Sequence, residues 1–215
     1  MLFRSGGAGE ARIAAQVAAK MRRLGLTVTT LEAVPGRPSV VGRLKGSGGG
    51  RALMLNAHLD TVGIEGMTDA LAPAIRDGRL YGRGAYDMKG SLAACLAAVK
   101  ALVDAKTALS GDVVLAAVAD EEYASIGTAE VVRRIPVSAA IVTEPTELDI
   151  CVAHKGFVWL EVETVGRAAH GSRFFDGLDA NMRMGRFLAR LDRLEQQLRA
   201  RPPHPLVGPP SLHAP

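Results

Sequence analysis

Aromatic side chains, cysteines and long apolar stretches are all scarce in this sequence. Aromatic residues make up 4% of the 215 positions, which leaves few stacking platforms for single-stranded nucleic acid. The two cysteines, Cys95 and Cys151, form no Cys-x-x-Cys pair, so neither a disulfide framework nor a cysteine zinc site is predicted. No apolar run approaches the ~20 residues that span a bilayer, and no secretory signal pattern opens the chain. We therefore expect a protein of the reducing cytoplasm, without a membrane partner.

The excess of positive charge is small. The 26 basic and 22 acidic residues give a net charge of +4, and a sequence pI near 9.3 raises the hypothesis of nucleic-acid binding. The arginines are scattered, however, except for one group at helical spacing, which is more simply interpreted as a solvated helix face: Arg183, Arg186, Arg190 and Arg193. We expect no nucleic-acid partner. The apolar fraction of 48% is ordinary for a globular protein with a sizeable core.

Helices and strands alternate in the predicted first part of the chain. The hydrophobic pattern predicts three helices, over 10–24, 88–105 and 128–134, and four strands, over 38–44, 51–56, 112–119 and 139–142. The last two strands are almost continuously apolar, which is typical of buried parallel strands. This alternation favours an α/β fold with a mostly parallel sheet flanked by helices. Residues Met1 to Ser5 are interpreted as a translated adapter scar and are left out of the fold.

The pattern changes after Asp149. Residues Phe157 to Val165 alternate between apolar and polar side chains, which predicts a half-exposed antiparallel strand. A helix over 178–199 and a proline-rich end follow. These elements are too few to close a core. We expect a first domain over 6–154, itself incomplete, and the start of a smaller α+β domain over 155–215 that stops before it is complete.

Ionisable side chains follow the predicted strands one after another. They come directly after three strand ends and at the entry to the long helix: His58 and Asp60, Glu121 and Glu122, Glu144, and Asp87. In open α/β sheets, ligands bind at the carboxyl ends of the strands. Each group alone also has a structural explanation, as a pinned histidine, a solvated turn or a loop cap. Together, unpaired acids would repel one another unless cations neutralise them, so the set predicts zinc or a similar divalent ion.

Four segments resemble successive signatures of the M20 metallopeptidases. They are Ala57-His-Leu-Asp-Thr-Val62, Gly82-Arg-Gly-Ala-Tyr-Asp-Met-Lys-Gly90, Asp120-Glu-Glu122 and Thr143-Glu-Pro-Thr146, and the second is the most specific. The resemblance extends over roughly residues 50–175. The family includes acetylornithine deacetylase, succinyl-diaminopimelate desuccinylase, aminoacylase-1 and glutamate carboxypeptidase. It implies a zinc-peptidase-like catalytic domain followed by the start of an inserted dimerisation domain.

The resemblance also implies a role for each candidate residue. His58 and Glu144 would bind one zinc ion, Asp87 would bridge two ions, and Glu122 would bind the second. Cobalt or manganese would also suit such a site. Asp60 would hydrogen-bond the ring of His58 and fix its tautomer. Glu121 would be the general base.

His170 is the candidate from the second domain. Its segment, Gly166 to Ser172, resembles a family motif whose histidine reaches across a homodimer and stabilises a developing oxyanion. The alternative is a loop histidine without a role. In the family, a later histidine completes the second metal site, and later residues bind the substrate carboxylate. We therefore expect the chain to be the amino-terminal part of a longer enzyme, with an incomplete second metal site.

The expected function is metal-dependent hydrolysis of an amide bond. The substrate would be an N-acyl amino acid or small peptide, attacked by a metal-bound hydroxide with Glu121 as base. An M28-type aminopeptidase is one alternative, which the inserted domain and the His170 motif disfavour. The other is an inactive fragment or relative that serves as a binding or dimerisation module, against which Glu121 argues because the fold does not need it. The sequence does not identify the acyl group.

Overall fold

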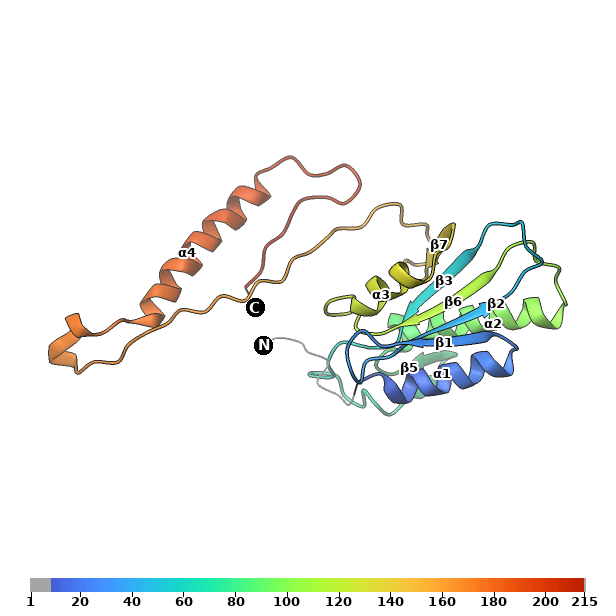
Figure 1. Cartoon of the computed structure of the whole chain (residues 1–215). Helices are drawn as coiled ribbons and strands as arrows, with labels where there is room; N and C mark the ends of the chain where they lie inside the picture. The colour runs from blue at the N-terminus through green and yellow to red at the C-terminus, as the bar shows by residue number, and fades with distance from the viewer. Residues whose placement is uncertain (1–8, 215) are drawn as a thin grey trace. The chain divides into compact units, whose positions relative to one another are not determined.

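The computed structural model describes residues 9–214, so the expected scar at Met1–Ser5 lies outside the described residues. The chain divides into two compact units, one ending at Leu148 and one beginning at Asp149 (Figure 1).

A five-stranded sheet forms the centre of the first unit. Its order is β1-β2-β6-β3-β7, with β1 at Thr27–Leu31, β2 at Ser39–Leu44, β3 at Leu53–His58, β6 at Val113–Val118 and β7 at Ala139–Val142. The β6, β3 and β7 strands are parallel neighbours, whereas β2 is antiparallel to both β1 and β6. Four strands therefore run in one direction and β2 runs in the other. The predicted α/β fold is confirmed, with a mixed sheet.

Helices cover both faces of this sheet. On one face, α1 (Ala11–Arg23) and α2 (Gly90–Asp104) bury apolar side chains against alternate residues of the strands; on the other face, Val131 of α3 (Ile126–Arg134) packs on a second cluster (Figure 1). Consecutive residues of β6 divide between the two clusters, because successive side chains of a strand point to opposite faces. This two-sided burial explains the almost continuously apolar sequence of β6.

Three features of the first unit differ from the sequence predictions. Strand β7 is exposed rather than buried, because it lies at the sheet edge and pairs with β3 alone among the described strands. The hydrophobic pattern did not predict strand β1. Nor did it predict the hairpin of β4 (Ala74–Arg76) and β5 (Arg79–Tyr81). The hairpin's turn residues Asp77 and Gly78 both have positive φ, so an Asp-Gly turn signal was present in the sequence.

The second unit consists of extended chain, the short turn η2 (Gly171–Asp176) and α4 (Ala180–Arg199). The predicted helix is confirmed, and Asp179 caps it by accepting the backbone N–H of Met182 at 2.8 Å. The predicted strand over Phe157–Val165 is wrong. This segment pairs with no strand in the described part of the unit, and Leu160 is 82% exposed. Alternating side chains need a partner strand before they form a β-ladder.

Among residues 9–214, no helix combines the length and apolar character needed to cross a bilayer.

Candidate metal centre

The candidate metal ligands meet because three neighbouring strands end at the same edge of the sheet. In the parallel register, His58 at the end of β3 lies opposite Val118 of β6, and Asn56 lies opposite Val142 of β7. The residues that follow β6 and β7 therefore flank the end of β3. The backbone N–H of Thr143 donates to the carbonyl of Asn56 at 3.1 Å, which fixes the segment leading to Glu144.

His58 lies at the centre of this group and is 1% exposed. Its Nε2 atom is 3.0 Å from Oδ1 of Asp87, 3.9 Å from Oε1 of Glu144 and 4.0 Å from Oε2 of Glu121. One ligand atom from each of His58, Asp87 and Glu144 lies within 4.8 Å of the others. The structure thus brings together three of the four residues that the family resemblance implied as metal ligands.

Asp87 reaches the site from an irregular turn, η1 (Ala85–Lys89), that precedes α2. Gly84 begins this turn with a φ of +78°, and a Cβ atom there would lie 2.7 Å from Cγ2 of Thr61. Only glycine fits this combination of backbone angle and close approach without strain. Lys89 closes the turn, since its backbone N–H donates to the carbonyl of Gly84 at 2.8 Å, and its Nζ donates to the backbone carbonyl of Asp60 at 3.3 Å.

The loop after β6 carries the adjacent acids Glu121 and Glu122. Both carboxylate oxygens of Asp60 accept backbone N–H groups from this loop, Oδ1 from Glu121 and Oδ2 from Glu122, each at 3.1 Å. The family resemblance implied instead a hydrogen bond from the ring N–H of His58 to the carboxylate of Asp60. There the backbone carbonyl of Asp60 is the nearer group, 3.1 Å from Nδ1, and its carboxylate is 3.6 Å away. Asp60 therefore contacts the histidine and also holds the acid loop.

Burial and crowding disturb the protonation of the cluster. Burial, reinforced by the nearby carboxylates of Glu121 and Asp87, raises the pKa of Glu144 to about 7, although His58 opposes the shift. Burial also raises the pKa of Glu122, with Asp87 adding to the effect. For His58, burial lowers the pKa, but the hydrogen bond to Asp87 and the charges around it outweigh burial and raise the pKa. Carboxylates that resist ionisation together mark a site short of positive charge.

A divalent cation fits these residues. The donor set of imidazole and carboxylates suits zinc, cobalt or manganese. Glu122 adds an independent sign, because its buried Oε1 atom has no hydrogen-bond partner among residues 9–214. A buried acceptor without a partner is costly, and a cation would remove that cost. His58, Asp87 and Glu144 would hold one ion, and Glu122 would be available to bind a second.

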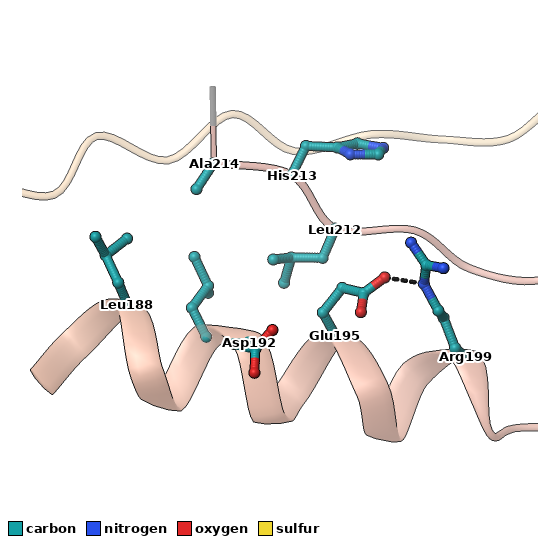
Figure 2. Close-up of a pocket in the computed structure, with 8 residues that line it drawn as sticks. Leu188, Asp192, Glu195, Arg199, Leu212, His213 and Ala214 are labelled. Atoms are coloured by element: carbon teal, nitrogen blue, oxygen red, sulfur yellow. Dashed lines mark hydrogen bonds and ion pairs between the residues drawn. The ribbon is translucent and has the colours of Figure 1, made fainter. Parts of the chain in front are cut away.

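The last predicted site residue, His170, belongs to the second unit. It is exposed, and its contacts are local: Nδ1 lies 2.9 Å from Oγ of Ser172. The second unit also contains a cavity of about 580 Å³ between α4 and the segment of Leu212 to Ala214. Figure 2 shows Asp192 and Glu195 on the helix side of this cavity and His213 on the other. All of its lining residues belong to the second unit, so none of the strand-end ligands borders it.

Three supporting contacts were not predicted from the sequence. Arg37 forms ion pairs with Glu10 and Asp120, which lie 27 and 83 positions away along the chain. No local pattern signals such distant partners. The buried thiol of Cys95 donates to Oγ1 of Thr143 at 3.7 Å, next to Glu144.

Comparison with known proteins identifies the family to which most of the chain is similar. The sequence profile described as peptidase family M20/M25/M40 matches residues 54–204. The chain is 41% identical over 153 residues to acetylornithine deacetylase of Myxococcus xanthus, covering 69% of this chain. It is 33% identical over 175 residues to N-formyl-4-amino-5-aminomethyl-2-methylpyrimidine deformylase of Bacillus subtilis, covering 77% of this chain. In both comparisons it spans 39% of the relative's length.

Solved structures show the same fold. Human carnosine dipeptidase 1 superposes with a TM-score of 0.52 and 25% identity, over 63% of this chain and 32% of that one. A tripeptidase from Staphylococcus aureus superposes with a TM-score of 0.59 over 84% of this chain and 51% of that one. At 19% identity, the tripeptidase supports the fold alone.

Proposed function

The chain belongs to peptidase family M20/M25/M40, and from that premise we propose that it supplies the metal-binding part of a hydrolase that cleaves an amide bond. The observation that carries this proposal is the cluster of His58, Asp87 and Glu144 around one point at the strand ends. Family membership also removes the M28-type aminopeptidase as an alternative.

Each ligand has a distinct place in the proposed centre. His58 and Glu144 would hold the first ion, Asp87 would contribute to both ions, and Glu122 would hold the second. A divalent ion held there would polarise a carbonyl oxygen and make a nearby water molecule easier to deprotonate. The backbone carbonyl of Asp60 contacts Nδ1 of the buried His58 imidazole. This contact orients the ring and leaves Nε2 as the nitrogen available for coordination.

Glu121 is the proposed general base. Its carboxylate lies at the rim of the cluster, 37% exposed, while its backbone is held by Asp60. It would accept the proton of the attacking water and later deliver that proton to the amine that leaves. The adjacent Glu122 cannot share this task while it holds a cation. Two neighbouring carboxylates thereby take different roles through their surroundings.

The substrate class that fits is an N-acyl amino acid, an N-formyl amine or a small peptide. Relatives of this chain act, by their names, on acetylornithine and on a formylated aminomethylpyrimidine, and a structural relative is a dipeptidase. The first two names describe removal of a small acyl group, and the third describes cleavage of a dipeptide. His170 as an oxyanion-stabilising residue, and a homodimer in which it reaches a partner's site, are part of this proposal.

Replacing Glu121 with glutamine tests the assignment of the base. The Glu121→Gln protein should bind zinc as tightly as the wild type, because Glu121 is not a ligand. Its turnover of N-acetyl, N-formyl and dipeptide substrates should fall by about 10²-fold or more. Zinc content by mass spectrometry and amine release by colorimetric assay measure the two effects. Loss of zinc from Glu121→Gln, or turnover equal to that of the wild type, would show that the base is wrongly assigned.

A further inference from the structure

A partly buried ion network connects the acid loop after β6 to the start of α1. Arg37, in the loop between β1 and β2, places its guanidinium between two carboxylates. One belongs to Glu10, at the residue that precedes α1, where Nε of Arg37 is 3.1 Å from Oε2. The other belongs to Asp120, immediately after β6. Both acids are almost completely buried, at 3% and 2% exposure.

Arg37 is suited to this arrangement by its shape. Its planar guanidinium presents several N–H donors at fixed angles, so one side chain can bind two carboxylates at once. Two buried carboxylates without a cation between them would repel each other and lose their solvation. A lysine in this place would keep the charge but would offer a single nitrogen on a flexible stem.

Asp120 connects this network to the candidate centre. It directly precedes Glu121 and Glu122, and it turns the chain with a φ of +58°. Its carbonyl accepts the backbone N–H of Ser125 at 2.6 Å, which closes the loop. The loop is therefore held at two points: Asp60 binds its backbone N–H groups, and Arg37 binds the side chain at its first residue.

We propose that Arg37 is a positioning residue for the acid pair Glu121 and Glu122, acting through Asp120. In this role Arg37 holds the Asp120 side chain, and its effect passes along the loop backbone to the two acids. This inference rests on the proposed function, since the acid pair is assigned there to metal binding and proton transfer. It predicts that weakening the ion pair between Arg37 and Asp120 makes the loop after β6 more mobile and lowers the affinity for metal, even when the fold is intact.

A second arginine–aspartate pair supplies a matched control. Arg43 in β2 binds Asp112, which stands just before β6 at the opposite end of the same strand. The two pairs share residue types and both connect a basic side chain to an end of β6. Only the Arg37 pair lies at the end from which the acid loop begins.

Hydrogen exchange in the metal-free chain tests the positioning directly. Arg37→Lys keeps a positive charge and therefore has a better chance of folding than Arg37→Met. Backbone amides of Glu121 and Glu122 should exchange about 10-fold faster in Arg37→Lys than in the wild type, as expected for increased local opening. In Arg43→Lys the same two amides should exchange at the wild-type rate. Unchanged exchange in Arg37→Lys, or an equal increase in Arg43→Lys, would overturn the proposal.

Cobalt binding then tests the consequence for the centre. The visible absorption of Co²⁺ reports ligand geometry, and titration gives its affinity. Arg37→Lys should lower the affinity about 10-fold, in the range that supporting residues around metal ligands contribute, and should alter the spectrum. Arg43→Lys should change neither. Wild-type affinity and spectrum in Arg37→Lys would overturn the proposal. A wild-type chain that binds no Co²⁺ would contradict the metal centre itself, whereas the exchange rates would still decide whether Arg37 holds the loop.

Discussion

The two units of this chain differ in how far their apolar side chains are buried. In the first unit, the side chains of β6 are almost fully buried between helices on both faces of the sheet. In the second unit, α4 buries none of its residues, and the extended segment over Phe157–Val165 exposes most of its apolar side chains. Local sequence pattern is clear in both. The difference is whether neighbouring helices and strands are present for the apolar side chains to pack against. An amphipathic or alternating pattern forms packed structure only where such neighbours exist.

Core substitutions should show the largest contrast between the units. Leu115 in β6 is completely buried, so Leu115→Ala should lower the free energy of unfolding by about 3 kcal/mol. Leu160→Ala removes the same atoms from an exposed position, and its effect should stay within about 0.5 kcal/mol. Urea unfolding followed by circular dichroism measures both. An equal loss in Leu160→Ala would mean that Leu160 is packed in a core and that the contrast between the units is wrong.

Removing a metal ligand should produce the next largest contrast. Asp87→Ala should lower the affinity for Zn²⁺ by at least about 100-fold, which corresponds to about 2.7 kcal/mol, because Asp87 contributes to the three-residue cluster. Asp176→Ala is the control in the second unit, where that carboxylate pairs with Arg173 on the surface. Its affinity should equal that of the wild type. Calorimetric titration decides the matter, and tight binding by Asp87→Ala would remove Asp87 from the ligand set.

The pH dependence of stability should give the smallest and most specific effect. In the metal-free protein, the pKa of Glu144 is about 7, above its ordinary value of 4.5. The folded state therefore holds a proton that the unfolded chain releases, and this contribution is present below pH 4.5 and is lost as the pH rises through 7. The raised pKa of His58 acts in the same direction. The melting temperature of the metal-free protein should fall between about pH 5 and about pH 8.

Zinc should reverse this trend, because the ion replaces the proton on Glu144. The rise in melting temperature on adding Zn²⁺ should thus be larger at about pH 8 than at about pH 5.5. Glu144→Gln is a control of nearly the same shape that does not titrate, and its metal-free profile should be flatter. A wild-type profile that is already flat would show that Glu144 ionises normally in the folded protein.

The sequence predicted the candidate metal ligands better than the contacts that hold them in place. Strand ends can be located from apolar runs, and parallel strands end at a common edge, so the sequence alone brings His58, Glu121 and Glu144 to one edge. Asp87 precedes a helix instead of following a strand, so its place beside His58 was implied by the family resemblance and not by the strand pattern. The double hydrogen bond from the acid loop to Asp60, and the link from Arg37 to Asp120, depend on contacts between residues far apart in the chain. The alternation of apolar and polar residues over Phe157–Val165 led to the wrong prediction of a strand for a related reason. The alternation describes the side chains of the segment, but it does not show whether a neighbouring strand is present.

The contrast between the two cysteines has a practical consequence. Cys95 is buried against Thr143, and burial raises the pKa of its thiol, which keeps it in the unreactive protonated form. Cys151 is exposed in the second unit. A maleimide dye added to the folded, unmodified chain should attach to Cys151 alone. The wild-type protein therefore carries one natural attachment point, through which a dye can be placed in the second unit without altering the metal ligands.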